Sequence, residues 1–395
     1  MAEAGATATA TAEAEPDWLG DRRSRGTGLV ETLELPTKKV KGWEFTDLDG
    51  LDLDSYDRAP AEVEISGGSD EIVVMALDEA LSQHSDLIGE HLGSLVPAED
   101  PFVARNEAGW SDGVLVYVPR NVICEEPVKV KLDLDNAGTA TYWRTLIVLE
   151  EGARAEVWEH YGSEGDETDA MLNSVVELSV GQNANLHYIN TQDLSEKAWL
   201  FSSQRSEVER DGKLDWAALG FGGGNGKVRM TTNLAGQGSE ARVTGGYAGG
   251  NGQHLDFDTL QEHAAEDTVS DLAFRGVLAD RSTAVWRGMI KVDEGAQRTD
   301  AFQECRNMLL SPDAHADAIP GLEILADDVA CTHAAAVAQV DKDQLFYLKS
   351  RGLSDDDSRS LVVEGFLQAL VERLGQGPVR DEIAARIEER LEEIL

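Results

Sequence analysis

The stretch "GQNANLHY" (residues 181–188) is one of a series of related segments that decide the fold. In each segment a turn rich in glycine, asparagine or aspartate leads into alternating apolar and polar residues, which is typical of a half-buried strand. The other clear members are "EEGARAEV" (150–157), "RDGKLDW" (210–216) and "GQGSEARV" (236–243). Their glycines are Gly152, Gly181, Gly212 and Gly238, spaced 29, 31 and 26 residues apart. A strand–turn–strand unit repeated at this period predicts a solenoid of β-coils, although a β-sandwich would also contain many short strands.

Changes in composition and in the spacing of apolar residues divide the chain into four parts. Short alternating runs fill the middle, and helical spacing returns at Asp341. We therefore expect a disordered acidic tail (1–15), an N-terminal helical or mixed region (16–105), a β core (106–340) and a C-terminal helical region (341–395).

The C-terminal region carries clear helix signals. Asp341 with Gln344 three residues later matches a capping box, and Ser354 precedes three acidic residues that suit the first turn of a helix. The expected apolar stripe of the next helix is Leu361, Val362, Gly365, Phe366, Leu370 and Leu374. The expected stripe of the last helix is Ile383, Ile387, Leu391 and Ile394.

Charge limits the classes of partner. The formal net charge is −40, and acidic residues outnumber basic ones along the whole chain. Such a chain repels nucleic acid and anionic membranes, so neither is an expected partner. Self-repulsion of this size is screened at molar salt, where the Debye length is about 3 Å, which predicts a salt-rich cytoplasm and a halophilic source. The start "MAEAGATATATAEAE" lacks the features of a signal peptide, and no apolar run is long enough for a membrane span.

Two motifs are open to a functional and a structural interpretation. "FGGGNGKV" (221–228) resembles a phosphate loop, but Phe221 and Val228 occupy positions where that loop needs glycine and Ser or Thr, so we expect a glycine-rich bend and no bound nucleotide. "HLDFDTLQEH" (254–263) places His254 and Asp256 on one face of a strand. With His263 they could hold a metal, although satisfied structural polar residues are the more common case.

The cysteines raise a similar question. The chain has three, at 124, 305 and 331, which cannot form an even disulfide framework, and it has no CxxC motif. On a strand, Cys331 and His333 would project from one face, and thiolate with imidazole suits iron, copper or zinc. Two ligands do not complete a site, so the others would come from Cys305 or from another chain. The structural alternative is that each cysteine is a small core residue.

A longer comparison of motifs identifies a family. The stretch "LEILADDVACTHAAAVAQVDKDQLFYLKSRGLSDDDSRSLVVEGFL" (322–367) closely resembles the C-terminal signature of the SufB/SufD family of iron–sulfur cluster assembly proteins. "LPTKKVKGWEFTDL" near the start, "WSDGVLVYVPRNV" at 110 and "RGMIKVDEGAQRTDAFQECRNMLLS" at 287 agree in order. The chain looks like the SufD branch, because the lysine-rich N-terminal segment is a SufD feature and Ala334 stands where SufB has a glutamate.

This resemblance implies a fold and a role. Family members have a right-handed parallel β-helix core flanked by N-terminal and C-terminal helical regions. They are non-catalytic scaffolds: SufD pairs with SufB, its C-terminal helices dock the SufC ATPase, and a transient cluster is built at the shared interface. Carried onto this chain, His333 is the interface residue near the cluster, and Phe366 and Leu370 belong to the ATPase-docking helices. Cys331 is a weaker candidate, because not all members have a cysteine there.

One residue departs from the SufD pattern. Cys305 falls where SufB carries the cysteine thought to receive sulfur, so His333 and Cys305 together are candidate metal ligands shared with a partner chain. This leaves an alternative in which the chain is a SufB-like homomeric scaffold, pairing as a homodimer and carrying its own cluster through Cys305. A polysaccharide-acting enzyme on a β-solenoid is a third reading, which would need a carbohydrate cleft.

The charge generates a first prediction. Dilution below about 0.5 M salt, where the Debye length exceeds about 4 Å, leaves the carboxylates less screened, so the fold should loosen. Thermal melting across a salt series checks this. A melting temperature that stays constant on dilution would contradict it.

Overall fold

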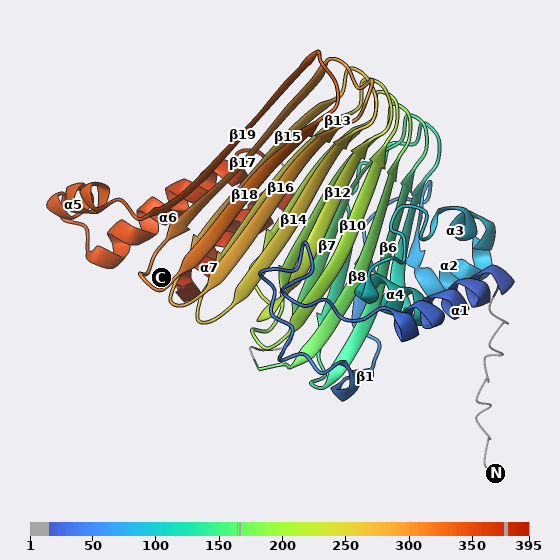
Figure 1. Cartoon of the computed structure of the whole chain (residues 1–395), viewed down its shortest axis with the longest axis horizontal. Coiled ribbons are helices and arrows are strands. Elements are labelled where there is room, and N and C mark those ends of the chain that lie inside the picture. Colours follow the sequence, from blue (N-terminus) through green and yellow to red (C-terminus); the bar gives the residue numbers. More distant parts are fainter. Residues whose placement is uncertain (1–15, 164, 166, 375–377, 395) are drawn as a thin grey trace, which may run out of the picture.

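The computed structural model describes residues 16–163, 165, 167–374 and 378–394. It is a mainly β structure in which a solenoid of about eight turns carries helices at both ends (Figure 1). The sequence-based prediction of a β-helix core between helical regions is confirmed. The predicted disordered tail, residues 1–15, lies outside the described residues.

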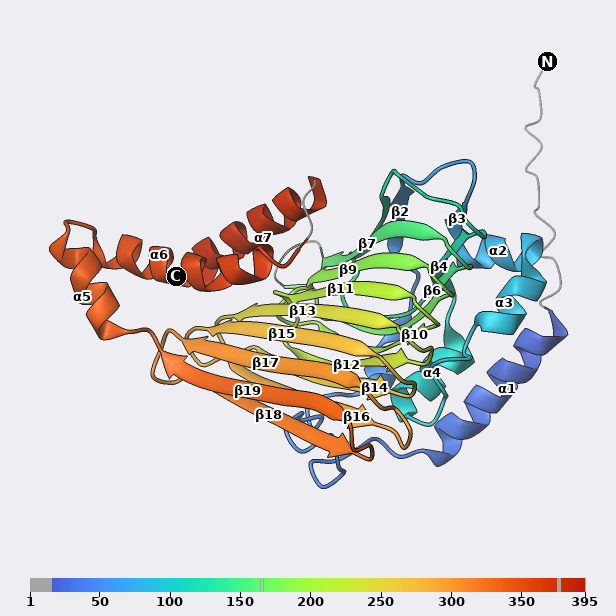
Figure 2. The same cartoon turned by 90° about the horizontal axis from the view of Figure 1, so that it is seen from above.

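The strands form two sheets. The first has the order β18-β16-β14-β12-β10-β8-β6-β4-β3, with β1 also paired to β6, and the second has the order β19-β17-β15-β13-β11-β9-β7-β5-β2. Consecutive long strands alternate between the sheets, so each pair of strands is one coil (Figure 2). The bounds in the first sheet are β1 (Asp57–Arg58), β3 (Val73–Ala76), β4 (Asp112–Val118), β6 (Thr139–Leu149), β8 (Ala170–Val180), β10 (Trp199–Val208), β12 (Asn225–Leu234), β14 (His254–His263), β16 (Thr283–Val292) and β18 (His315–Ile324). Those in the second sheet are β2 (Glu62–Ser66), β5 (Val128–Leu134), β7 (Arg154–Ser163), β9 (Asn185–Asp193), β11 (Lys213–Gly220), β13 (Glu240–Gly249), β15 (Val269–Leu278), β17 (Thr299–Leu309) and β19 (Val329–Gln339).

Parallel, in-register pairing builds the core. In β15, Leu272 pairs with Val243 of β13 and with Gln303 of β17, so equivalent positions of successive coils stack in columns. Because side chains alternate between the faces of a strand, every second column points into the interior of the solenoid. The interior columns are filled by large apolar residues such as Trp216 and Phe274, which are fully buried. The repeat seen in the sequence is therefore the repeat of these columns.

The turns explain why glycines recur at only part of the predicted positions. At the first seven corners from the first sheet to the second, a residue at an equivalent place takes a positive φ, and these residues are Asn121, Gly152, Asn183, Asp211, Gly238, Asp267 and Arg298. They are 27 to 31 residues apart. Asparagine and aspartate tolerate this left-handed conformation better than most residues. Gly181 and Gly212 only flank the corner, so the equivalence assigned to them by sequence was shifted by one or two residues.

The N-terminal region covers the outer face of the first sheet. Its helices are α1 (Asp17–Thr32), α2 (Leu77–Gln83), α3 (Ser85–His91) and α4 (Pro101–Gly109), with a 3-10 turn at Leu53–Ser55. Asp100 caps α4, because its carboxylate accepts from the backbone N–H groups of Phe102 and Val103. Tyr142 and Phe201 of the sheet pack into a shared apolar cluster with this region.

The C-terminal helices are α5 (Lys342–Ser350), α6 (Asp355–Val371) and α7 (Pro378–Ile394). Asp341 and Ser354 cap α5 and α6 as predicted. The predicted stripe of α6 is partly wrong: Leu361 is 49% exposed, and the face that packs on the second sheet carries Val363, Leu367, Leu370, Val371 and Leu374. This face follows helical spacing from Val363 rather than from Leu361. The predicted stripe of α7 does face the sheet, with Ile383, Ile387 and Leu391 buried.

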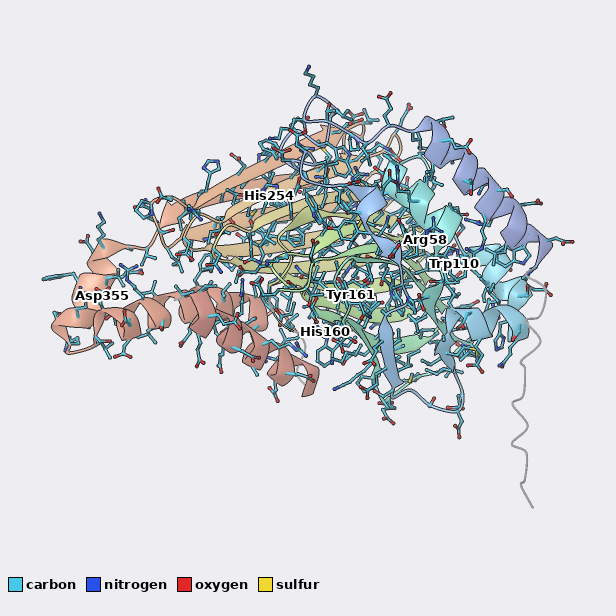
Figure 3. The ribbon with its side chains drawn as sticks, turned by 90° about the horizontal axis from the view of Figure 1, so that it is seen from below. Arg58, Trp110, His160, Tyr161, His254 and Asp355 are labelled. Carbon is cyan, nitrogen blue, oxygen red and sulfur yellow. The ribbon has the colours of Figure 1, made fainter. Side chains whose placement is uncertain are left out.

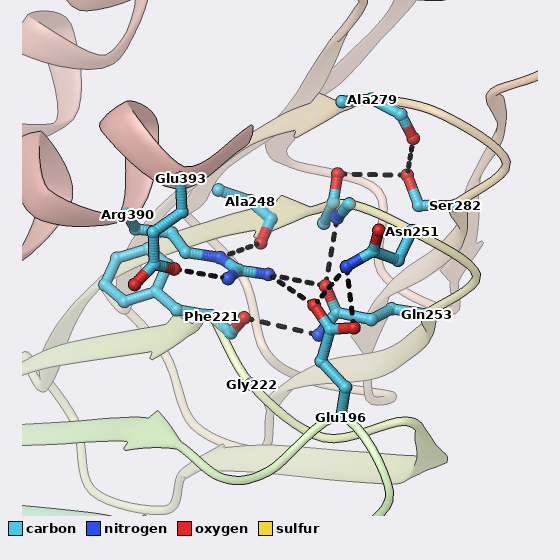
Figure 4. A network of polar contacts seen from close by, with 12 residues as sticks. Glu196, Phe221, Gly222, Ala248, Asn251, Gln253, Ala279, Ser282, Arg390 and Glu393 are labelled. Atoms are coloured by element: carbon cyan, nitrogen blue, oxygen red, sulfur yellow. Dashed lines mark hydrogen bonds and ion pairs between the residues drawn. The ribbon is translucent and has the colours of Figure 1, made fainter. Parts of the chain in front are cut away.

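A buried arginine fastens α7 to the solenoid (Figure 4). Arg390 donates to Gln253 Oε1 at 2.6 Å and to the carbonyl of Ala248 at 3.3 Å, and it pairs with Glu393 at 2.6 Å. Gln253 in turn donates to the carbonyl of Gly223 at 3.0 Å. The network links the last helix to two turns of the β-helix, so α6 and α7 are bound to the second sheet by both apolar and polar contacts.

An ion cluster joins the N-terminal region to the first coils. Arg144 of β6 is fully buried and pairs with Glu107 of α4 and, at 3.5 Å, with Glu177 of β8. Although burial raises the pKa of Glu107, Arg144 and Arg22 outweigh it and hold that pKa below its ordinary value. Burial lowers the pKa of Arg144, against the two carboxylates. The three charges therefore depend on one another.

Removing the central charge should be costly. Arg144→Met leaves Glu107 and Glu177 in the interior with one cation fewer, and we expect a loss of about 3–5 kcal/mol in the free energy of unfolding. Urea unfolding followed by circular dichroism checks this. The control is Arg22→Met. Because the Arg22 side chain is partly exposed, this substitution should lower the free energy of unfolding by less. Equal losses for the two variants would contradict the central role of Arg144.

Candidate functional site

The two ends of the solenoid differ in how they finish. At the N-terminal end, the short strands β2 and β3 pair antiparallel with β5 and β4 and are the outermost strands of their sheets. At the C-terminal end, β18 and β19 are the last strands of their sheets, and within the described chain no strand pairs with their outer edges. An edge strand presents unpaired backbone N–H and C=O groups, which readily pair with another chain.

The last coil also leaves the solenoid core uncovered. Register places Leu322 and Ile324 of β18 above Ile290 and Val292, and Val337 of β19 above Asn307, all at interior positions. Yet Leu322 is 37%, Ile324 38% and Val337 43% exposed. These side chains belong to the interior column but have no further coil over them. The open end is therefore an apolar surface as well as a backbone edge.

His333 lies at the mouth of this open interior. It pairs in register with Gln303, an interior residue of β17, so its side chain starts from the interior face of β19. The imidazole is exposed, and none of the described residues is its hydrogen-bond or ion-pair partner. Beneath it, Gln303 is fully buried and donates across the interior to the carbonyls of Gly288 at 3.2 Å and Gly321 at 3.0 Å. Gln303 therefore lies directly beneath His333, at the open end of the solenoid interior.

Cys331 shares the face of His333. It pairs with Ala301, another interior residue, and packs at the edge of a small apolar cluster with Val292 and Ala301. Its thiol is partly buried, and burial together with the nearby Asp300 raises its pKa. The predicted side-by-side projection of the two residues is thus seen, with a thiol that is less readily ionised than usual.

Cys305 lies one coil deeper. It is fully buried beneath Ala335, 3.5 Å from Asn307 Nδ2 and 3.9 Å from the hydroxyl of Tyr247. Burial raises the pKa of its thiol to about 12. A thiolate is the form that binds metals and attacks sulfur, so this environment disfavours both reactions. Strand geometry puts the Cys305 and His333 backbones roughly 8 Å apart, as diagonal neighbours on the interior face of two paired strands.

The motif at 254–263 is divided between the two faces of β14. His254, labelled in Figure 3, and Asp256 point outward, and His254 is bonded to Thr283 at 2.8 Å. Asp256 accepts from Thr46 at 2.5 Å and from Lys227 at 2.7 Å. His263 points inward, to Thr268 at 2.7 Å, and burial lowers its pKa to about 4. The structural interpretation applies, and in the described chain no group of three or more His, Cys, Asp or Glu is placed to hold a metal ion.

The other glycine-rich motif is a corner of the solenoid. Residues 221–224 form the bend before β12, and Lys227 lies within that strand, paired with Asp256. The predicted bend is confirmed, and the lysine is engaged in an ion pair.

The C-terminal helices place their candidate residues differently. Leu370 is 1% exposed and packs over Gly246 of the chain's own sheet. Phe366 is partly buried, with the guanidinium of Arg275 5.1 Å from its ring centre. The exposed apolar side chains of this region are instead Phe346 (74%) and Tyr347 (56%) on α5, followed by Leu361 and Leu353. Sequence reasoning missed the two aromatic residues, although "LFY" in a polar helix was a usable signal.

Comparison with known proteins agrees with this architecture. Residues 132–366 match the profile of the SufBD core domain of the SUF system of iron–sulfur cluster assembly, and residues 53–130 match the SufBD N-terminal region. The iron–sulfur cluster assembly protein SufD of Bacillus subtilis is 29% identical, over 95% of each chain. A SufBD family protein of Staphylococcus epidermidis is 28% identical, over 81% of this chain and 68% of its own length.

Among the described helices, none has the length and apolar character needed to cross a membrane. The two profile matches follow each other along the chain, from the N-terminal region through the solenoid and into α6. The chain therefore belongs to the SufB/SufD family of iron–sulfur cluster assembly proteins and is SufD-like.

Proposed function

We propose that this chain is the SufD-type scaffold subunit of a SUF assembly complex, without catalytic activity of its own. It pairs with SufB through the open end of the solenoid and docks the SufC ATPase through its C-terminal helices. A nascent iron–sulfur cluster, the cargo of the complex, is built at the shared interface beside His333. The observation that carries the proposal is the uncovered last coil, at which the His333 imidazole has no hydrogen-bond or ion-pair partner among the described residues.

The open end suits a partner with the same architecture. A second solenoid could continue both sheets at once by pairing with the edges of β18 and β19, and it would cover Leu322, Ile324 and Val337. Backbone pairing supplies affinity, and the apolar interior residues supply hydrophobic burial of about 25 cal/mol per Å².

His333 fits the role of a ligand donated to a shared site. Imidazole binds iron, and a site divided between two chains needs only one or two ligands from each. The partner would also enclose the mouth and exclude water from it. Cys331, partly buried two residues away, is a secondary candidate.

Burial opposes the homomeric alternative. A scaffold that carried its own cluster through Cys305 would need an accessible thiolate, but that thiol is fully buried and its pKa is raised to about 12. The observations likewise do not favour the alternative of a polysaccharide-acting enzyme on a β-solenoid.

The exposed aromatic pair on α5 is the best candidate surface for the ATPase. Phe346 and Tyr347 are each more than half exposed to solvent. Aromatic residues are enriched among the residues that contribute most to binding at protein interfaces, so this exposed pair is a candidate anchor. The helix is joined to β19 by only two residues, Val340 and Asp341. The docking surface is thus close in sequence to His333.

The cluster proposal is tested on the purified complex. For His333→Gln we expect a folded SufB–SufC–SufD complex that loses most of its iron and sulfide, because glutamine keeps polarity but cannot act as an imidazole ligand or proton carrier. Iron and acid-labile sulfide are measured after purification without oxygen. Cys331→Ser should lose little, and Cys305→Ala, the buried matched control, should retain the cluster wherever the complex folds. Normal cluster content in a well-folded His333→Gln complex would return this residue to a packing role.

The docking proposal has its own test. Replacing Phe346 and Tyr347 together by serine should weaken SufC binding by at least about tenfold, since aromatic hot-spot residues of an interface contribute about 2 kcal/mol or more. Calorimetric titration with SufC measures it. Ile123→Ser is the control, because this apolar residue is 49% exposed but lies between β4 and β5, at the N-terminal end of the solenoid. Phe366→Asp should instead loosen α6, seen as a lower melting temperature. Wild-type SufC affinity in the folded double variant would contradict the assignment to α5.

A further inference from the structure

We propose that the loop at residues 37–42, here called the cationic loop, binds an acidic segment of SufB, the partner proposed to cover the open end of the solenoid. This inference rests on the proposed function, because it assigns a second contact to the same partner. It concerns the lysine-rich motif of the N-terminal region, which the cluster site does not use.

The cationic loop is rigidly shaped. Two consecutive turns form it, with the N–H of Val40 bonded to the carbonyl of Thr37 at 2.8 Å and the N–H of Trp43 to the carbonyl of Val40 at 2.9 Å. Gly42 adopts a φ of +92°, which other residues rarely take. A loop that already holds its shape loses little conformational entropy when a partner binds.

Buried contacts hold the base of the loop on the first sheet. Trp43 is 4% exposed, stacks on Phe102 of α4 and lies under the guanidinium of Arg229 at 4.7 Å. Three residues further, Thr46 donates to the buried Asp256 at 2.5 Å. The loop is therefore a projection with a fixed base rather than a free segment.

Its charge contrasts with the rest of the molecule. Three of the eleven lysines of the chain, Lys38, Lys39 and Lys41, fall within four residues, in a chain of net charge −40. All three are exposed, and so is Val40 between them, at 45%. Lys38 pairs with Asp47 at 2.5 Å, whereas in the described part of the chain no carboxylate pairs with Lys39 or Lys41. Two cations are thus left free on an acidic surface.

The position of the loop connects it to the open end. Directly after it, Glu44 pairs with Arg287 of β16 at 2.8 Å, and Gly42 lies close to the same guanidinium. Arg287 is in register with Ile319 of β18, the edge strand, whose outward side chain is 38% exposed. Neighbouring strands are about 4.8 Å apart, so the loop stands within one strand of the edge. Figure 2 shows the blue N-terminal segment on the outer side of the first sheet.

Charge decides which partner this surface fits. A strongly acidic chain repels long polyanions as a whole, so a nucleic acid or an anionic membrane would meet two free lysines within a repulsive field. An acidic segment of a protein already held at the edge of β18 meets them at short range. Charged contacts at the rim of an interface speed association and fix register, and here they would offset repulsion between two acidic subunits.

The test compares two variants that remove the same charge. Lys39→Gln/Lys41→Gln removes the free cations, and Arg154→Gln/Lys213→Gln removes two exposed cations of the second sheet, on β7 and β11, away from the open end. Association and dissociation of full-length chain and SufB are followed by stopped flow over a KCl series, down to the lowest salt at which circular dichroism shows native fold. We expect the loop variant to associate at least about threefold more slowly at the lowest salt, with unchanged dissociation and with convergence at molar salt. The control should associate like the wild type.

A chemical readout identifies the contact. Carbodiimide couples an amine to a carboxylate only when the two touch, so it should join Lys39 or Lys41 to an acidic peptide of SufB in the wild-type complex. Equal association rates for all three proteins, or cross-links that avoid the loop, would overturn this inference and leave the proposed pairing intact. A wild type that does not pair with SufB would overturn both. If Lys39→Gln/Lys41→Gln lost binding to DNA or anionic vesicles but paired with SufB as the wild type does, the inference would also be overturned.

Discussion

Each coil of this molecule is held by parallel, in-register pairing with the coil before it, and that pairing cannot satisfy the last coil. At the N-terminal end the outermost strands are the short β2 and β3, which pair antiparallel with β5 and β4. At the other end the chain leaves the solenoid for helices immediately after β19, so two strand edges and part of the core remain uncovered. An exposed edge of this kind is normally avoided or blocked. Its retention over both sheets, with His333 at the centre, is the physical ground for placing the functional surface there.

One coil of depth separates two kinds of cysteine chemistry. Cys331 stands in the outermost layer and keeps contact with solvent, whereas Cys305 is in the layer beneath, where burial raises the pKa of its thiol to about 12. Both residues face the interior of the same sheet. The difference therefore comes from stacking alone, and a chain with one coil fewer would expose Cys305 instead. The family resemblance of that position is to a reactive cysteine, but its surroundings here are those of a core residue.

The sequence predicted the repeating features well, because they depend on short-range physics that repeats. Turn residues and alternation indicated the coils, and the caps Asp341 and Ser354 began their helices as expected. The phase of α6 was misjudged since Leu361 and Val363 are equally apolar, and only the position of the sheet decides which one is buried. For the same reason the burial of Cys305 and Leu370 depends on residues distant in sequence. Cys331 and His333 could be placed on one face because that relation needs only the period of a strand.

The proposed ATPase surface on α5 and the proposed cluster site on β19 are close in sequence, and α5 is held differently on its two sides. No residue of α5 is buried, so this helix is held mainly through the segments on either side of it. On one side is α6, which is fixed by apolar contacts such as Leu367 and continues into a region anchored by Arg390. On the other side is β19, an edge strand that is bonded to β17 along only one edge. Only Val340 and Asp341 separate α5 from β19, the strand that carries His333. In this fold a partner that moves α5 therefore acts directly on the end of the strand that forms the open edge of the solenoid.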